Sequence, residues 1–407
     1  MRILFILPHF TPDLGPLAPI YHALGEDLIE RGHEATVVTA FPYYGEGEIW
    51  GEYKGKVFGI EEVDGMRVIR TYVYVAPKGK LLGRSLSYLT FHLLATVASL
   101  FLAGRHDAIV APSPSIQIGL PLYLTSLLFG TPFIYNVQDL YPHVGVEAGV
   151  FKNKWLVGAL KRLEGMLLGR ARYVVVIADN FGRELVRRGV PPDKIITIPN
   201  CVDADFIRPL PRLNGFREKY QLGDKFVVMY AGNVGLSQGL ETLLQCAQMF
   251  TEDGILFVIV GEGASLPSLK QRVLEMKLDN VQFIPYQPRE DVPFVLAAAD
   301  ISLVLLRSGI ASHSVPSKAF SIMASSRPIV AAVDRPSEIA DIIGEARCGL
   351  LVEPENPEQL AKAISDLYYS ESLRDELARN GRHYVERHYS RSVASNKYAQ
   401  LLERIEQ

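Results

Sequence analysis

The amino-acid sequence predicts an α/β protein built from two Rossmann-like, doubly wound domains that face a cleft. First, 407 residues are too many for one ordinary hydrophobic core, so two domains are expected. Second, short apolar runs alternate with helical patterns along the chain, and most runs are apolar on both faces, as parallel strands covered by helices are. Third, the series breaks near residues 199–203 and 208–211, which are rich in proline.

The expected strands of the first domain are apolar runs separated by helical patterns. The run at residues 2–7 begins with one positive charge, Arg2, and is followed by Pro8. Its apolar part is too short for the apolar region of a signal peptide, so it is interpreted as a buried strand. The first domain is therefore expected at residues 1–203. Its expected strands lie at residues 2–7, 35–39, 66–74, 108–111, 132–137, 173–177 and 195–198.

The second domain repeats this alternation and is expected at residues 204–387. Helical patterns close the chain, and the last, at about residues 388–407, is expected to pack back on the first domain. The expected strands lie at residues 226–230, 256–260, 281–284, 301–305, 328–332 and 349–352, and the closing helices at 357–369, 372–386 and 393–406.

Composition excludes several classes of protein. Lys and Arg number 42 against 45 Asp and Glu, a net charge of −3, and this balance argues against nucleic-acid binding, which usually needs a strongly basic face. Cys201, Cys246 and Cys348 are far apart and show no CxxC spacing, so we expect neither a disulfide framework nor a zinc site. We therefore expect the protein to work in a reducing compartment.

Two segments indicate an anion site. Residues 231–239 end a strand in a Gly-rich turn before a helix, and the turn at Gly232 and Gly235 can offer free backbone N–H groups to an anion. Lys318, near the start of another helix, can add a full positive charge. The pair predicts a site for the pyrophosphate of a nucleotide-activated substrate in the cleft outside the strands' carboxyl ends. The alternatives are a tight turn without a ligand and a solvated lysine.

Several motifs, in order along the chain, resemble those of family 4 glycosyltransferases. They are Arg31-Gly-His-Glu-Ala-Thr-Val-Val-Thr, Pro199-Asn-Cys-Val-Asp, the segment 232–244, Gly261-Glu-Gly, Ala324-Ser-Ser-Arg-Pro-Ile-Val and the segment 349–361. The element Val315-Pro-Ser-Lys is similar to that of a bacterial subgroup that builds cell-surface polysaccharides and includes fucosyl and N-acetylfucosaminyl transferases.

The resemblance implies a GT-B fold, with the nucleotide-sugar donor in the second domain and the acceptor in the first. It implies transfer of a hexose, N-acetylated or deoxy, from a UDP-sugar to a polyprenyl-diphosphate-linked glycan, with retention of configuration and with no cofactor or metal. Cys201 departs from the family motif, and Gln138 stands where the family has a histidine before Asp139.

Larger departures leave two alternatives open. Asn233 and Gln238 stand where the family has an Arg and a Lys, and His313 and Ser321 stand where it has a Glu pair. These losses fit a non-catalytic GT-B subunit that binds donor or lipid for a partner enzyme. A nucleotide-sugar 2-epimerase shares the two-domain layout and is the other alternative.

The site residues follow from matching positions and from the strand-to-helix turns. Asp139 and Lys318 are the expected catalytic residues, although Asp139 could simply cap a turn before Pro142. Asn233 and Glu338 could likewise cap helices instead of touching a ligand. The expected donor-binding residues are Gly15, Gly232, Asn233, Gly235, Gly263, Tyr286, Arg307, His313, Ser317, Lys318, Ser321 and Glu338.

An uncharged stretch at residues 85–104 suggests contact with a membrane. It has nearly the ~20 residues needed to span a bilayer, but a true span would divide the first domain's sheet, so we expect a peripheral protein on the cytoplasmic, anionic face of the plasma membrane. A core helix beside an ordinary solvated face is the alternative. The basic residues near it in the sequence are Lys78, Lys80, Arg84, Lys152, Lys154, Lys161, Arg162, Arg170 and Arg172.

Overall fold

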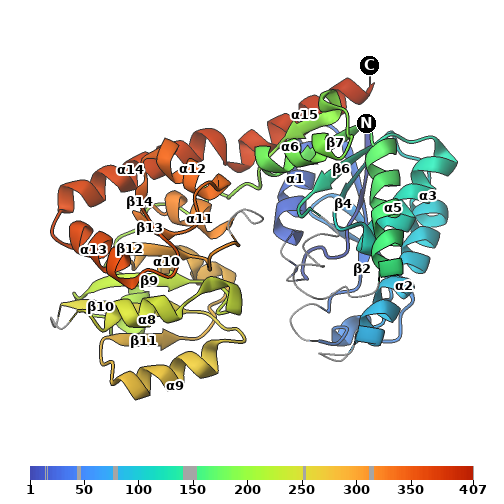
Figure 1. Ribbon diagram of the computed structural model, residues 1–407. Coiled ribbons are helices and arrows are strands. Elements are labelled where there is room, and N and C mark those ends of the chain that lie inside the picture. Colours follow the sequence, from blue (N-terminus) through green and yellow to red (C-terminus); the bar gives the residue numbers. More distant parts are fainter. Residues whose placement is uncertain are drawn as a thin grey trace. The chain divides into compact units, whose positions relative to one another are not determined.

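The computed structural model describes residues 1–13, 15, 17–43, 47–76, 81–140, 154–250, 254–310 and 316–406. The chain forms two compact units, which we call the first and second domain (Figure 1). The first comprises Met1–Asn200 with Ala394–Gln407, and the second comprises Cys201–Val393.

An eight-stranded sheet forms the centre of the first domain, in the order β3-β4-β2-β1-β5-β6-β7-β8. Its strands are β1 (Arg2–Ile6), β2 (Glu34–Ala40), β3 (Phe58–Val63), β4 (Met66–Thr71), β5 (Ala108–Pro112), β6 (Phe133–Val137), β7 (Tyr173–Val176) and β8 (Ile195–Thr197). The helices are α1 (Ala18–Glu30), α2 (Leu81–Val97), the π-helix η2 (Ala98–Ala103), α3 (Ser115–Phe129), α5 (Lys154–Arg170), α6 (Asp179–Arg187) and α15 (Arg391–Glu406), with short 3-10 helices η1 (Gly51–Tyr53) and η3 (Pro192–Lys194).

One strand of this sheet was not predicted. β3 pairs antiparallel with β4, whereas the other neighbouring strands are parallel. None of its residues is fully buried, because it lies at the sheet edge. An edge strand lacks the continuous apolar run by which the buried strands were recognised.

The second domain has a fully parallel six-stranded sheet in the order β11-β10-β9-β12-β13-β14. Its strands are β9 (Phe226–Ala231), β10 (Ile255–Val260), β11 (Val281–Ile284), β12 (Ile301–Leu305), β13 (Ile329–Ala332) and β14 (Gly349–Val352). Its helices are α7 (Gly215–Lys219), α8 (Glu241–Ala247), α9 (Leu266–Met276), α10 (Val292–Ala297), α11 (Lys318–Ala324), α12 (Glu338–Ala346), α13 (Pro357–Tyr368) and α14 (Glu371–His388), with 3-10 helices η4 (Leu236–Gln238) and η5 (Arg289–Asp291).

Helices on both faces explain why the strands are apolar throughout. Every residue of β10 and β12 is buried, and the side chains of β9 alternate between two hydrophobic clusters. Consecutive strand residues point to opposite faces, so both faces of this sheet are covered by packed side chains.

The C-terminal helix α15 packs on the first domain. Tyr398 is buried in the same hydrophobic cluster as Phe5 of β1, and its hydroxyl accepts a hydrogen bond of 2.6 Å from Asn136 Nδ2 at the end of β6. The amino group of Lys397 also donates to the carbonyl of Thr197. These contacts return the end of the chain to the domain in which it began (Figure 1).

Candidate functional site

A pocket of about 420 Å³ lies at the carboxyl ends of β9 and β10 in the second domain. The strand order reverses here, because β9 pairs with β10 on one side and with β12 on the other, and open parallel sheets bind ligands at such points. The described residues that line it are Ala231, Gly232, Asn233, Val260, Gly261, Glu262, Tyr286, Gln287, Val292, Val295, Leu296, Lys318, Ser321 and Ile322.

Two glycine turns form one wall of this pocket. Gly232 has a φ of +144° and Gly261 a φ of +140°, which side chains with a Cβ rarely adopt. A Cβ on Gly261 would lie 2.0 Å from the carbonyl oxygen of Gly232. The two turns approach each other closely because Gly261 has no side chain. The free N–H groups expected at Gly232 and Gly235 are not found, because they donate to the Val260 carbonyl and to Gln238 Oε1.

Lys318 reaches the same wall from the first residue of α11. Its Nζ lies 3.4 Å from the position of a Cβ on Gly232 and donates a hydrogen bond of 2.6 Å to the Tyr230 hydroxyl. Burial of the amino group lowers the pKa of Lys318 to about 7, although the residue as a whole is only half-buried by exposed area. The pKa depends on the surroundings of Nζ, because Nζ is the atom that titrates.

Asn233, Gly235 and Gly263 surround the same turn. A Cβ on Gly263 would lie 2.8 Å from Asn233 Oδ1, and a Cβ on Gly235 would lie 2.8 Å from Asn233 Nδ2. The N-terminal cap positions of η4 and α8 are Gly235 and Leu240, so Asn233 caps neither helix. The structure thus brings these three predicted residues together, but of the three only Asn233 lines the pocket.

The remaining lining includes residues that sequence reasoning missed. Tyr286 and Ser321 were predicted, and Tyr286 is 66 % exposed beside the pocket. Glu262 and Gln287 were not predicted, although they follow β10 and β11 directly, as site residues in a parallel sheet do. Glu262 is the sole carboxylate among the described lining residues.

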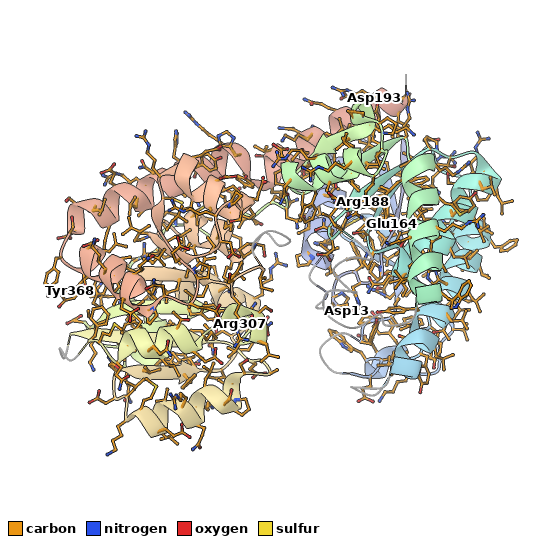
Figure 2. The ribbon with its side chains drawn as sticks, in the orientation of Figure 1. Asp13, Glu164, Arg188, Asp193, Arg307 and Tyr368 are labelled. Atoms are coloured by element: carbon orange, nitrogen blue, oxygen red, sulfur yellow. The ribbon has the colours of Figure 1, made fainter. Side chains whose placement is uncertain are left out.

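Four other predicted donor-binding residues lie outside the pocket lining or the described residues. Arg307, labelled in Figure 2, donates its backbone N–H to Ser237 in η4. Its guanidinium lies 3.5 Å from a Glu241 carboxylate oxygen. Ser317 is exposed at the cap position of α11, and Glu338 begins α12, whose cap is the Ser337 side chain. His313 lies outside the described residues.

Two predicted residues belong to the first domain. A Cβ on Gly15 would lie 2.4 Å from the Cβ of His9, so this glycine lets the His9 side chain pack against the backbone. His9 Nδ1 lies 2.8 Å from an oxygen of Asp13, whose side chain is fully buried. Asp139 follows β6 and is exposed, and desolvation by nearby protein atoms raises its pKa above the ordinary value.

A wider groove of about 1000 Å³ lies at the opposite end of the second domain's sheet, near Phe226 and Asp300. Three of the charged side chains there have structural partners: Arg327 donates to the carbonyls of Ala297 and Leu210, and Arg212 pairs with Asp300. Ligands of parallel sheets bind at the carboxyl ends of the strands, so the smaller pocket is the better candidate.

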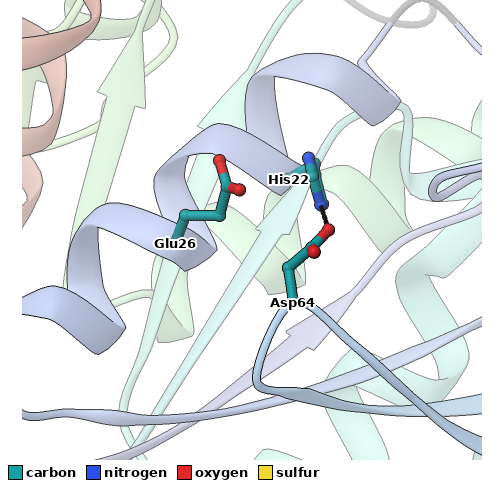
Figure 3. A group of neighbouring side chains, drawn as sticks. All are labelled: His22, Glu26 and Asp64. Carbon is teal, nitrogen blue, oxygen red and sulfur yellow. Dashed lines mark hydrogen bonds and ion pairs between the residues drawn. The ribbon is translucent and has the colours of Figure 1, made fainter.

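A cluster of potential metal ligands on the first domain was also not predicted (Figure 3). His22 and Glu26 lie one turn apart on α1, and Asp64 lies in the turn between β3 and β4. The ligand atoms lie within 4.8 Å of one another, and His22 Nε2 already forms a 2.8 Å hydrogen bond with Asp64. This spacing would admit a cation, but partly exposed groups of this kind are common without one.

The uncharged stretch forms a helical segment with one exposed apolar side. Within the described residues, Leu86–Ala103 is long and apolar enough to cross a membrane by length and composition, and only 28 % of it is buried. One side of it carries exposed residues at a spacing of three or four: Leu86, Leu89, Leu93, Val97 and Phe101. We call these five residues the apolar face of α2 and η2.

Among the basic residues expected near this surface, Lys161, Arg162, Arg170 and Arg172 are exposed. α5, which carries three of them, packs against α3, and α3 packs against α2. Lys78, Lys80 and Lys152 lie outside the described residues, as do the side chains of Arg84 and Lys154.

Comparison with known families divides the chain as the structure does. Residues 17–201 match the family described as "Glycosyl transferase 4-like domain", and residues 214–384 match "Glycosyl transferases group 1".

Curated relatives match over most of their length. The "Probable glycosyltransferase WbjE" of Pseudomonas aeruginosa is 28 % identical over 324 residues, which cover 79 % of this chain and 80 % of that protein. The "Putative colanic acid biosynthesis glycosyl transferase WcaI" of Escherichia coli K12 is 27 % identical over 387 residues, which cover 89 % and 91 %.

Solved structures match both domains. Sucrose-phosphate synthase from Thermosynechococcus elongatus gives a TM-score of 0.76 at 18 % identity and covers 100 % of this chain and 99 % of that one. HepE of Anabaena in complex with UDP gives 0.74 at 16 % identity, covering 99 % and 100 %.

Proposed function

The chain is a group 1 glycosyltransferase with a GT-B fold, and we propose that it transfers a hexose from a UDP-sugar to a polyprenyl-diphosphate-linked glycan during synthesis of a bacterial cell-surface polysaccharide. The predicted fold class is thereby confirmed. WcaI is named for colanic acid biosynthesis and HepE was solved with UDP, which supports the polysaccharide and the UDP-sugar in the proposal.

One observation carries the proposal: a buried lysine and two glycine turns meet at the switch point of the second domain's sheet. Gly261 lets the Gly232 turn pack closely against its own turn, and Lys318 Nζ lies beside the Gly232 turn. A cation and two glycine turns at the carboxyl ends of parallel strands are suited to a diphosphate. We infer that they replace the Arg and Lys of the family motif.

We further propose that transfer retains the sugar's configuration and needs no metal. The described lining contributes one carboxylate, Glu262, and no histidine or cysteine, which is a poor set for binding Mg²⁺ or Zn²⁺. Lys318 would therefore supply the positive charge that faces the diphosphate. Asp139 in the first domain is the proposed group that orients the acceptor.

A peripheral position on the cytoplasmic face of the membrane would bring the enzyme to a lipid-linked acceptor. The apolar face of α2 and η2 supports this part of the proposal, because Leu93 and Phe101 are 53 % and 79 % exposed. Anionic vesicles should sediment the wild-type protein, and Leu93→Glu should reduce the bound fraction without changing thermal stability. Equal sedimentation of both proteins, or none of the wild type, would contradict the membrane proposal.

The function itself is tested by turnover. The purified enzyme, with a chelator present, should transfer labelled sugar from a UDP-sugar to a polyprenyl-diphosphate acceptor, and NMR of the product should show the donor's anomeric configuration. Lys318→Ala should abolish transfer. A folded enzyme that transfers sugar equally well with Ala at position 318 would disprove the diphosphate assignment.

A further inference from the structure

Lys318 has an unusual set of contacts for the only cationic side chain among the described pocket residues. Its Nζ donates to the Tyr230 hydroxyl at 2.6 Å and lies 4.0 Å from the centre of the Tyr230 ring. The hydroxyl in turn donates to the backbone carbonyl of Asn233 at 2.7 Å. Tyr230 therefore links the lysine to the turn that would receive the diphosphate.

The charged neighbours do not neutralise this lysine. The charged residues around α11 and the pocket include Glu262, Arg289, Glu290, Asp291, Arg307, Arg382 and Glu386. The other charged or titratable residues of α14, which packs on α11, include Glu371, Arg374, Asp375, Glu376, Arg379, His383, Arg387 and His388. None of them forms an ion pair with Lys318 in the described part of the chain: Arg382 pairs with Glu386, Arg307 lies near Glu241, and Glu262 is exposed. His313 lies outside the described residues.

A buried amine without a carboxylate partner resists protonation. Transfer of a charged ammonium out of water is costly, and a hydroxyl and an aromatic ring return only part of that free energy. Burial accordingly lowers the pKa of Lys318 from its ordinary value of 10.5 to about 7. An entering diphosphate would place negative charge beside Nζ and would favour the protonated form of Lys318.

We propose that Tyr230 is a positioning residue for Lys318, and that Lys318 takes up a proton from solvent when the diphosphate of the donor enters the pocket. This inference rests on the proposed nucleotide-sugar site. The proton binds to the Nζ lone pair, and no bond of the donor is broken in this step. Donor affinity would therefore depend on pH through a residue that belongs to the binding site itself.

The expected proton uptake follows from the pKa of the empty site. A group with a pKa of about 7 is about nine-tenths protonated at pH 6 and about one-tenth protonated at pH 8. If Lys318 is fully protonated in the complex, uptake rises from about 0.1 proton at pH 6 to about 0.9 at pH 8. Above pH 7, the donor affinity should fall up to about tenfold per pH unit.

Calorimetry of the wild-type enzyme measures this uptake directly. UDP-glucose and UDP-N-acetylglucosamine are suitable probes, because their diphosphate is a diester and has no titration near neutrality. Each probe is titrated at pH 6 and at pH 8 in two buffers with different ionisation enthalpies, and the difference in heat gives the number of protons. Binding with no uptake at pH 8 would overturn this inference and leave the proposed function intact. If no UDP-sugar binds, the proposed donor site fails and this inference fails with it.

Two variants separate positioning from a merely structural role. Lys318→Arg keeps a cation that does not titrate, so any residual binding should be free of proton uptake. Tyr230→Phe removes the hydroxyl that accepts from Nζ and should weaken UDP-sugar binding about tenfold while moving the midpoint of uptake to lower pH. A Tyr230→Phe enzyme that is less stable but has an unchanged midpoint would show that Tyr230 acts only in packing.

Discussion

Replacing Lys318 with methionine should stabilise the empty second domain and remove its donor binding. Methionine has a similar length and no charge, so it fills the same space under the glycine turn without the desolvation cost of an ammonium. Opposite effects on stability and binding are expected of a residue kept for function at a cost in stability. An ordinary structural lysine would not show this pair of effects.

The size of the stability gain in Lys318→Met follows from the lowered pKa of Lys318. Lowering it from 10.5 to about 7 corresponds to about 5 kcal/mol of burial cost while the folded protein is protonated. Methionine loses the hydrogen bond that the amine makes to Tyr230 in either protonation state and leaves an acceptor site of that hydroxyl unsatisfied, which together cost about 3 kcal/mol. The variant should therefore be more stable by about 2 kcal/mol at pH 6, which is about 4–8 °C in Tm for a unit of this size.

The pH dependence has a defined sign. Between pH 7 and pH 10.5 the unfolded state binds the lysine proton and the folded state does not, so the burial cost falls by about 1.4 kcal/mol per pH unit. The stabilisation in Lys318→Met should thus be greatest at or below pH 7 and should disappear near pH 9.

Thermal or urea unfolding at pH 6 and pH 9, with and without UDP, measures both effects. Lys362→Met provides the control, because Lys362 is exposed on α13 of the same domain, and its replacement should change neither stability nor UDP affinity. A Lys318→Met protein that is less stable than wild type at pH 6, or whose stability difference is the same at both pH values, would refute the reasoning.

Three other substitutions test the structural account. Gly261→Ala places a Cβ 2.0 Å from the Gly232 carbonyl and should reduce UDP affinity at least tenfold in calorimetry while the circular dichroism spectrum stays native. Asp300→Ala leaves the buried Arg217 guanidinium without its 2.7 Å partner and should cost about 3–5 kcal/mol in urea unfolding; a cost below 1 kcal/mol would contradict that pairing. Tyr398→Phe removes the acceptor of Asn136 Nδ2 and should cost about 1–3 kcal/mol without changing UDP affinity.

Much of the fold could be predicted because buried parallel strands have a simple signature. Runs such as those of β10 and β12 are apolar on both faces, and the structure places strands at each of the predicted runs. The ends of the strands were predicted less accurately: a strand was predicted at residues 66–74, but β4 ends at Thr71. The missed β3 lies at an edge, where a strand needs no continuous apolar pattern.

Residues of the candidate site could be predicted where a short segment, such as a strand-to-helix turn, marks them. Gly232 and Lys318 stand at strand-to-helix turns, and both line the pocket. Tyr230 was missed because, in the middle of an apolar run, it has the pattern of a core residue, and only its hydroxyl contacts distinguish it. Glu262 and Gln287 could have been found from their positions directly after β10 and β11.

The most direct test of the central claim is calorimetric binding of UDP, GDP, dTDP and ADP, with a chelator present, to the wild type and to Lys318→Met in parallel. We predict that the wild type binds UDP selectively and that the folded Lys318→Met protein binds it at least tenfold more weakly. Equal UDP affinity in both proteins, or no nucleotide binding to the wild type, would contradict the assignment of this pocket to a nucleotide-sugar diphosphate.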